Sequence, residues 1–328
     1  MRGRMKRLCA LLLAAALLAG LTACGGKGAK ATAEGGPLKI VATIFPEYDW
    51  VKNVLGENPA GAELTMLLDK GVDLHSFQPT ADDILTISSC DLFLYVGGTS
   101  DAWVRDALEN AMNGRMIVID LMETLGEAVR AEELVEGMQG EDEEEAEEEI
   151  EYDEHVWLSL RNAGVIVPRI AAALETLDPA NAETYQANAA AYLEQLDALD
   201  AEYRAAVSAA PVSTLLFGDR FPFRYLTEDY GLNYYAAFIG CSAETEASFE
   251  TVTFLAGKVD ELGLSAVLTI DGSDGRIAET IVQNTRTKDQ RILALDSMQA
   301  TTAEDVGSGA TYLAAMERNL AVLKEALQ

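Results

Sequence analysis

The chain has 328 residues, of which 49% are hydrophobic and 24% charged, a composition typical of globular proteins. This length is enough to bury a sizeable core and predicts two domains. Its 24 Lys and Arg residues against 54 Asp and Glu residues give a formal net charge of −30, which argues against a nucleic-acid partner and favours cations.

The N-terminal segment, residues 1–23, predicts a signal peptide. A basic leader, MRGRMKR, precedes an apolar run of 14 residues at 8–21, which is too short to span a bilayer as a helix. The run ends in LTAC, where small residues before Cys24 resemble the lipobox of bacterial lipoproteins, whose cysteine is acylated. An ordinary signal peptide with a chance cysteine is the alternative. The glycine-rich residues 24–37 then predict a lipid-anchored flexible tether.

Residues 38–180 predict an α/β lobe. Short apolar runs, rich in β-branched or aromatic residues, alternate there with helical patterns. The runs are LKIVAT (38–43), ELTMLL (63–68), LFLYVG (92–97) and MIVID (116–120). Alternation of this kind predicts a mostly parallel sheet that helices cover on both faces.

An acidic stretch lies near the end of this first lobe. EDEEEAEEEIEYDE at 141–154 has 11 acidic residues among 14, and no core can form from such a sequence. We therefore predict an acidic loop over 139–152. It is either a solvated loop without a function of its own or a weak, exchangeable collector of cations beside His155.

The second half predicts one long helix and another α/β lobe. At 181–210 apolar side chains recur at three- and four-residue spacing, and Pro211 follows directly. Strand-like runs then alternate with helical patterns through 211–328; they are VSTLLFG, YYAAFIG, AVLTID and RILALD. The fold class is therefore α/β, with two lobes, each a mostly parallel four-stranded sheet flanked by helices, joined by one long rigid helix.

Four polar residues are candidates for a metal site. In open parallel sheets, ligands bind in loops beyond the carboxyl ends of strands. His75, in GVDLHSFQPT, and His155, in YDEHVWLSL, are the only histidines of the chain, and Asp219 and Asp271 follow strand-like runs of the second lobe. Two imidazoles and two carboxylates suit a first-row divalent ion. Each residue also has a structural interpretation: Asp219 can pair with a neighbouring arginine, and Asp271 precedes a glycine as turn residues do.

Several segments, in order along nearly all of the mature chain, resemble the metal-binding lipoproteins of bacterial ABC importers, the zinc- and manganese-binding group of solute-binding proteins. The segments are DLHSFQPTADDI, DEHVWLSLRNA, the acidic insert, the long DPAN…YQANAAAYLEQLDALD helix and FRYLTEDYGL. The resemblance implies two lobes around a metal in the cleft between them. It assigns two ligands to His75 and His155 and a fourth to Asp271, with Asp274 as the alternative.

The third ligand of that family falls on Gly218, which has no side chain. Three replacements stay open: Asp219 from the next position, a water molecule, or Glu244 or Cys241 from the GCSAETE segment. Because the ligand set is incomplete, the residues alone suit Zn²⁺, Mn²⁺ and Fe²⁺ alike. Zinc is favoured slightly, since the acidic insert lies where zinc-binding members of the family carry a charged loop.

The expected function is that of a monomeric, non-enzymatic lipoprotein on the outer face of the bacterial cytoplasmic membrane. It would capture Zn²⁺, or in second place Mn²⁺, and deliver it to the permease and ATPase subunits of an ABC importer. One alternative is a metal-dependent hydrolase, which also needs a metal with an open position, although no HExxH motif or nucleophile elbow occurs. A surface adhesion lipoprotein is the other.

Overall fold

The computed structural model describes residues 36–140, 151–242 and 246–328. The predicted signal peptide, the lipidation site Cys24, most of the tether and of the acidic loop, and Glu244 therefore lie outside the described residues. No helix in the described part of the chain is both long and apolar enough to cross a bilayer.

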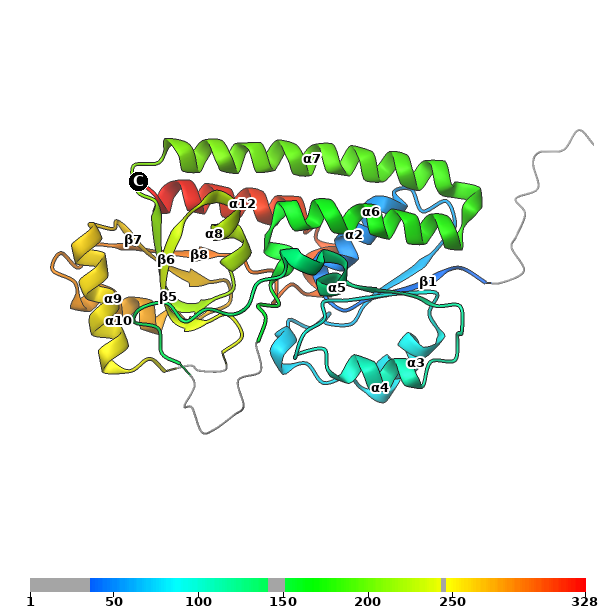
Figure 1. Ribbon diagram of the computed structural model, residues 1–328, viewed down its shortest axis with the longest axis horizontal. Helices are drawn as coiled ribbons and strands as arrows, with labels where there is room; N and C mark the ends of the chain where they lie inside the picture. Colours follow the sequence, from blue (N-terminus) through cyan, green and yellow to red (C-terminus); the bar gives the residue numbers. More distant parts are fainter. Residues whose placement is uncertain (1–35, 141–150, 243–245) are drawn as a thin grey trace, which may run out of the picture. The chain divides into compact units, whose positions relative to one another are not determined.

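The first lobe contains a four-stranded parallel sheet (Figure 1). Its strands are β1 (Lys39–Ala42), β2 (Glu63–Met66), β3 (Leu92–Tyr95) and β4 (Ile117–Asp120), and their order across the sheet is β2-β1-β3-β4. The helices of this lobe are α2 (Phe45–Leu55), α3 (Ala81–Ser89), α4 (Trp103–Glu109), α5 (Leu121–Leu125) and α6 (Leu160–Leu177). Because β1 and β3 are buried nearly throughout, their sequences are almost continuously apolar, as expected for a sheet covered on both faces.

The second lobe repeats this architecture with the same relative strand order. Its strands are β5 (Thr214–Phe221), β6 (Asn233–Ile239), β7 (Ala266–Ile270) and β8 (Arg291–Leu295), ordered β6-β5-β7-β8 and all parallel. Its helices are α8 (Arg224–Tyr230), α9 (Phe249–Leu262), α10 (Arg276–Asn284), α11 (Ala303–Gly307) and α12 (Tyr312–Ala326). The predicted fold class is therefore confirmed, while the predicted residue bounds of the lobes stay a prediction.

The long helix α7 (Ala182–Ala209) packs against both lobes. Its 28 residues, at about 1.5 Å each, reach along α6 and α2 of the first lobe and along α12 and α8 of the second (Figure 1). Asn188 donates a 3.0 Å hydrogen bond to the carbonyl of Val54, and the hydroxyl of Tyr203 donates one of 2.6 Å to the carbonyl of Met316. A side-chain hydrogen bond therefore links the helix to each lobe, in addition to the packing of its buried face.

Buried aromatic side chains connect the lobes below α7, close to His155. The indole of Trp157 is fully buried and donates a 2.9 Å hydrogen bond to the carbonyl of Ser297, which follows β8. The hydroxyl of Tyr312, on α12, donates a 2.7 Å bond to the carbonyl of Trp157. Because both bonds cross from one lobe to the other, they hold the chain segments of the candidate site in a fixed relation.

Candidate metal site

The two histidines lie in short 3-10 turns of the first lobe, and their side chains meet. His75 is in the turn Leu74–Ser76 after β2, where the Asp73 carboxylate accepts a 3.0 Å bond from the His75 backbone N–H. His155 precedes the turn Val156–Leu158, and Asp153 accepts a 2.8 Å bond from its backbone N–H in the same way. The Nε2 atoms of the two imidazoles are 3.2 Å apart. The local DxH sequence thus fixes the backbone of both histidines.

Hydrogen bonds on the outer ring nitrogens orient both imidazoles. Nδ1 of His155 is 3.0 Å from Asp153 Oδ1, and Nδ1 of His75 is 2.8 Å from Ser100 Oγ and 3.4 Å from Glu154 Oε2. A carboxylate accepting from Nδ1–H leaves the lone pair of Nε2 free, which is how proteins commonly orient metal-binding histidines. For bonds of ~2.05 Å in a tetrahedral zinc site, two nitrogens are about 3.3 Å apart, close to the separation found here.

Gln299, in the segment after β8, closes the site from the second lobe. Its side-chain nitrogen is 3.0 Å from His155 Nε2 and 3.3 Å from His75 Nε2, so when both rings carry their proton on Nδ1 the amide donates to both Nε2 lone pairs. His155 is fully buried and the side chain of His75 is 12% exposed. A metal ion bound by the two imidazoles must displace this amide or turn its oxygen toward the ion. Sequence reasoning missed Gln299, because a single Gln in a loop carries no recognisable signal.

Cys241 is the third candidate ligand beside the histidines. Its sulfur and one nitrogen of each imidazole lie within 4.8 Å of one another, and among the described residues no other group of three or more His, Cys, Asp or Glu side chains does so. The residue follows β6, and its backbone N–H donates a 3.3 Å bond to Glu132. The sequence analysis named Cys241 only as one of several replacements for the third ligand.

Four carboxylates surround this group: Asp73, Glu132, Asp153 and Glu154. Asp153 is 1% exposed, and its Oδ2 atom has no hydrogen-bond partner among the described residues. Burial, followed by the charge of Asp153, raises the pKa of Glu132 to about 6. Burial also raises the pKa of the Cys241 thiol, with further upward shifts from Glu132, Asp153 and Glu154. A divalent cation bound here would compensate this concentration of negative charge and would favour the thiolate over the thiol.

An arginine of the second lobe reaches into the same region. Arg220 Nη2 is 2.7 Å from Asp73 Oδ2, an ion pair that crosses from β5 to the turn before His75. Burial raises the pKa of Asp73, but the hydrogen bond and charge of Arg220 outweigh it, so the net pKa lies below the usual value. Arg220 thus neutralises the outermost carboxylate and ties the lobes together beside the histidines.

The other predicted ligands do not join the histidine group. Asp219 is nearly buried: its Oδ1 accepts a 2.9 Å bond from the Arg220 N–H and its Oδ2 a 3.4 Å bond from the Ile270 N–H. Asp271 lines a separate small cavity of about 50 Å³ that also contacts Gln299. Asp274 is exposed and pairs with Arg276 at 3.1 Å. Ligand roles for these three aspartates stay predictions.

Position 218 points away from the cleft. A Cβ atom added to Gly218 would lie 2.5 Å from the Cα atom of Ala278 on α10, so any side chain there would enter that helix. Glycine at this position therefore permits close packing of α10 on β5. Arg220, two residues further along β5, is the residue at this strand end whose side chain reaches the first lobe.

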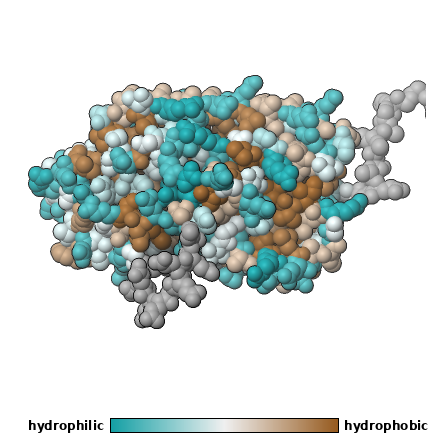
Figure 2. Space-filling view, viewed as in Figure 1, coloured by the Kyte–Doolittle hydropathy of each residue, from teal (hydrophilic) through white to brown (hydrophobic). Residues whose placement is uncertain are grey.

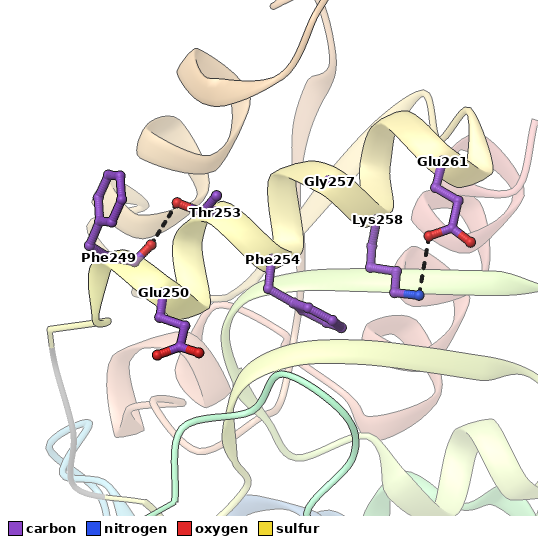
Figure 3. Close-up of a pocket in the computed structure, with 7 residues that line it drawn as sticks. All are labelled: Phe249, Glu250, Thr253, Phe254, Gly257, Lys258 and Glu261. Atoms are coloured by element: carbon purple, nitrogen blue, oxygen red, sulfur yellow. Dashed lines mark hydrogen bonds and ion pairs between the residues drawn. The ribbon is translucent and has the colours of Figure 1, made fainter.

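A cavity of about 280 Å³ lies against the histidine group and offers a polar approach to it. Its lining includes His75, Glu132, Glu154 and Cys241. A larger cavity, about 640 Å³, lies along α9 and is lined by side chains such as Phe249, Phe254 and Lys258 (Figure 3). No histidine or cysteine lines it, and Lys258 pairs with Glu261 at 3.2 Å. On the face shown in Figure 2 hydrophobic residues are interspersed with hydrophilic ones.

Comparisons with known proteins agree with the fold and with a metal site. The family model described as "Zinc-uptake complex component A periplasmic" (ZnuA) matches residues 40–326. The zinc-binding lipoprotein AdcA of Streptococcus pneumoniae is 29% identical over 327 residues, covering 98% of this chain and 61% of that protein. The high-affinity zinc uptake system protein ZnuA of Bacillus subtilis is 27% identical over 328 residues and covers 98% of both chains.

A solved structure extends the comparison to the fold. The Zn(II)-bound ZnuA-like domain of Streptococcus pneumoniae AdcA superposes with a TM-score of 0.69 at 27% identity and covers 89% of this chain and 99% of that domain. The chain spans 56% to 61% of the length of the AdcA relatives that it matches. It therefore corresponds to one part of those longer proteins.

Proposed function

Since the chain belongs to the family of the periplasmic component A of zinc-uptake complexes, we propose that it captures Zn²⁺ outside the cytoplasmic membrane and delivers it to an ABC importer. Relatives named as zinc-binding and zinc-uptake proteins, and a zinc-bound structural neighbour, support zinc as the cargo. The importer's permease and ATPase are its partners in this proposal. The protein acts as a monomeric carrier and catalyses no reaction, and the comparisons do not favour the hydrolase or the adhesion alternative.

The observation that carries the proposal is the geometry of the two histidines. The chain has only two histidines, and their Nε2 atoms are 3.2 Å apart, while the Asp153 carboxylate and the Ser100 hydroxyl lie within hydrogen-bonding distance of the Nδ1 atoms of His155 and His75. Two facing lone pairs repel each other unless a donor or a cation lies between them. A divalent ion bound to both nitrogens removes that repulsion and also compensates the surrounding carboxylates.

The position of the site suits a carrier. His75 and His155 come from the first lobe, whereas Gln299 and Cys241 come from the second, so an ion bound among them contacts both lobes. Its binding free energy therefore favours the arrangement in which the lobes are closed, which gives a receptor a means to recognise the loaded form. We further propose that Cys24 carries the lipid that holds the protein at the membrane; the AdcA relative of Streptococcus pneumoniae is named a lipoprotein.

Metal competition on the full chain, purified in detergent and stripped of metal, tests the proposal. We expect one Zn²⁺ per chain, a melting temperature that rises with zinc concentration by mass action, and weaker binding of Mn²⁺. Single His75→Ala and His155→Ala variants should each lose most of the zinc-dependent rise in melting temperature. Unchanged zinc stabilisation in either variant would contradict the proposal.

A further inference from the structure

Cys241 lies where a third protein ligand is needed, and the local chain is built to bring it there. At the end of β6, a Cβ atom added to Gly240 would lie 3.0 Å from His155 Cε1 and 3.0 Å from the carbonyl oxygen of Phe221. A larger residue would push this strand end and the imidazole apart by a few tenths of an ångström, so glycine permits the closest approach. The next residue, Cys241, is held from the first lobe by the bond between its N–H and Glu132.

We propose that Cys241 is the third protein ligand of the cargo ion, and that this sulfur makes the site selective for thiophilic divalent ions such as Zn²⁺ over Mn²⁺. The inference rests on the proposed function, because it concerns the same histidine pair. It names a ligand from the second lobe that replaces the one that Gly218, without a side chain, cannot supply.

The geometry permits this ligand set with little movement. The sulfur and one nitrogen of each imidazole lie within 4.8 Å of one another. In a tetrahedral zinc site with a Zn–S bond of ~2.3 Å and Zn–N bonds of ~2.05 Å, sulfur and nitrogen are about 3.6 Å apart. The thiol must therefore approach by at most about 1.2 Å, which a loop at the end of a strand can provide when Gln299 leaves the space between the imidazoles.

The chemistry of the step is a simple exchange of a proton for a metal ion. The S–H bond of Cys241 breaks, the sulfur electron pair forms the bond to the ion, and the proton leaves to solvent through the adjoining cavity. Zinc sites in proteins commonly combine imidazole nitrogens with cysteine thiolates. Thiolate is a soft ligand that favours Zn²⁺, whereas Mn²⁺ prefers carboxylate, carbonyl and water oxygens, so the sulfur shifts selectivity toward zinc.

The second described cysteine shows what a purely structural cysteine looks like in this protein. Cys90 is 0% exposed, its sulfur lies 3.4 Å from the Met116 sulfur, and it belongs to the hydrophobic core of the first lobe. Cys241, in contrast, lines a polar cavity beside His75 and Glu132. The difference in surroundings makes Cys90 a matched control.

Cobalt substitution tests the assignment, because Co²⁺ bound to thiolate gives a sulfur-to-metal charge-transfer band in the near ultraviolet. The full chain in detergent is titrated with Co²⁺, Zn²⁺ and Mn²⁺ as wild type, Cys241→Ser, Cys241→Ala and Cys90→Ala. We expect the band in wild type and Cys90→Ala and its loss in both Cys241 variants. The ratio of Zn²⁺ to Mn²⁺ affinity should fall at least tenfold in the Cys241 variants. The N-terminal segment with Cys9 and Cys24 is the same in every variant, so differences between the Cys241 variants and wild type belong to position 241.

A charge-transfer band and an affinity ratio that both survive in Cys241→Ser and Cys241→Ala would overturn the assignment. The double variant His75→Ala with His155→Ala separates this result from a failure of the proposed function. If the double variant loses Zn²⁺ binding while the Cys241 variants match wild type, only the sulfur ligand is wrong. If the double variant keeps wild-type Zn²⁺ binding, the proposed site itself is wrong, and the inference fails with it.

Discussion

Replacing Gln299 by leucine should make zinc binding tighter, although the residue touches both histidines. In the metal-free protein the Gln299 amide donates to His155 Nε2 at 3.0 Å and to His75 Nε2 at 3.3 Å. Leucine has a similar volume but no donor, so two buried acceptors lose their partner. The zinc-bound protein pays no such penalty, because the metal occupies both lone pairs.

The magnitude follows from the two lost bonds. A hydrogen bond contributes about 0.5–1.5 kcal/mol net, and one of these two is long, so the metal-free protein should lose about 1–2 kcal/mol of stability. If the substitution costs the zinc-bound form no stability, the free energy of zinc binding becomes more favourable by the same amount, which corresponds to an affinity about 5- to 30-fold higher.

Isothermal titration with a competing chelator measures this change, and thermal unfolding without metal measures the loss of stability. Gln290→Leu is the matched control: it also removes two hydrogen bonds, one accepted from Thr285 at 2.8 Å and one donated to Thr287 at 2.9 Å, in the same lobe but away from the histidines, and should leave zinc affinity unchanged. Weaker zinc binding in Gln299→Leu would refute the reasoning and would make the Gln299 oxygen a ligand of the ion.

Three further predictions concern other parts of the chain. Cys24→Ala should move the protein from the membrane to the soluble fraction on cell fractionation; retention at the membrane after removal of the leader would contradict lipidation. Asp219→Asn should leave the zinc affinity measured by titration nearly unchanged, because backbone N–H groups already occupy both carboxylate oxygens. Asp271→Asn should weaken zinc binding about two- to fivefold through the loss of one partly screened charge. A loss in Asp219→Asn as large as that in a histidine variant would instead make Asp219 a ligand. Burial, followed by the charge of Asp101, raises the pKa of Glu47 to about 8, so the stability that the protonated Glu47 contributes is present below about pH 4.5 and is lost as pH rises through about 8. Glu47→Gln should flatten this dependence of stability on pH in thermal unfolding of the metal-free protein, whereas Glu57→Gln, at an exposed position, should not. Equal pH slopes in the two variants would contradict the assignment.

The sequence predicted the fold class because its signals are local. Apolar runs such as LKIVAT and LFLYVG, separated by helical periodicity, mark buried parallel strands whatever the rest of the chain does. The two histidines stood out for a similar reason: they are the only ones in the chain, and each lies two residues after an aspartate that accepts a bond from its backbone N–H. The long helix was equally visible from spacing alone, and α7 (Ala182–Ala209) lies within the predicted 181–210.

The remainder of the site depends on contacts between distant segments. Arg220 and Asp73 are separated by 147 positions, and Gln299 and His75 by 224. Neither pair shows a local sequence pattern from which the contact could be predicted. Matching the chain to the motifs of the resembling family by residue spacing also placed the third ligand at Gly218. The packing of α10 on β5 leaves no room for a side chain at that position. Which of several neighbouring residues faces a cleft is decided by strand twist and register, and spacing alone does not supply these.

A crystal structure of the zinc-loaded protein, with anomalous diffraction at the zinc edge, tests the central claim most directly. We predict one strong anomalous peak at about 2.0–2.1 Å from Nε2 of both His75 and His155, with the Gln299 amide nitrogen displaced from between them. A fully occupied zinc peak elsewhere in the molecule, with the two Nε2 atoms still bridged by Gln299, would contradict the account.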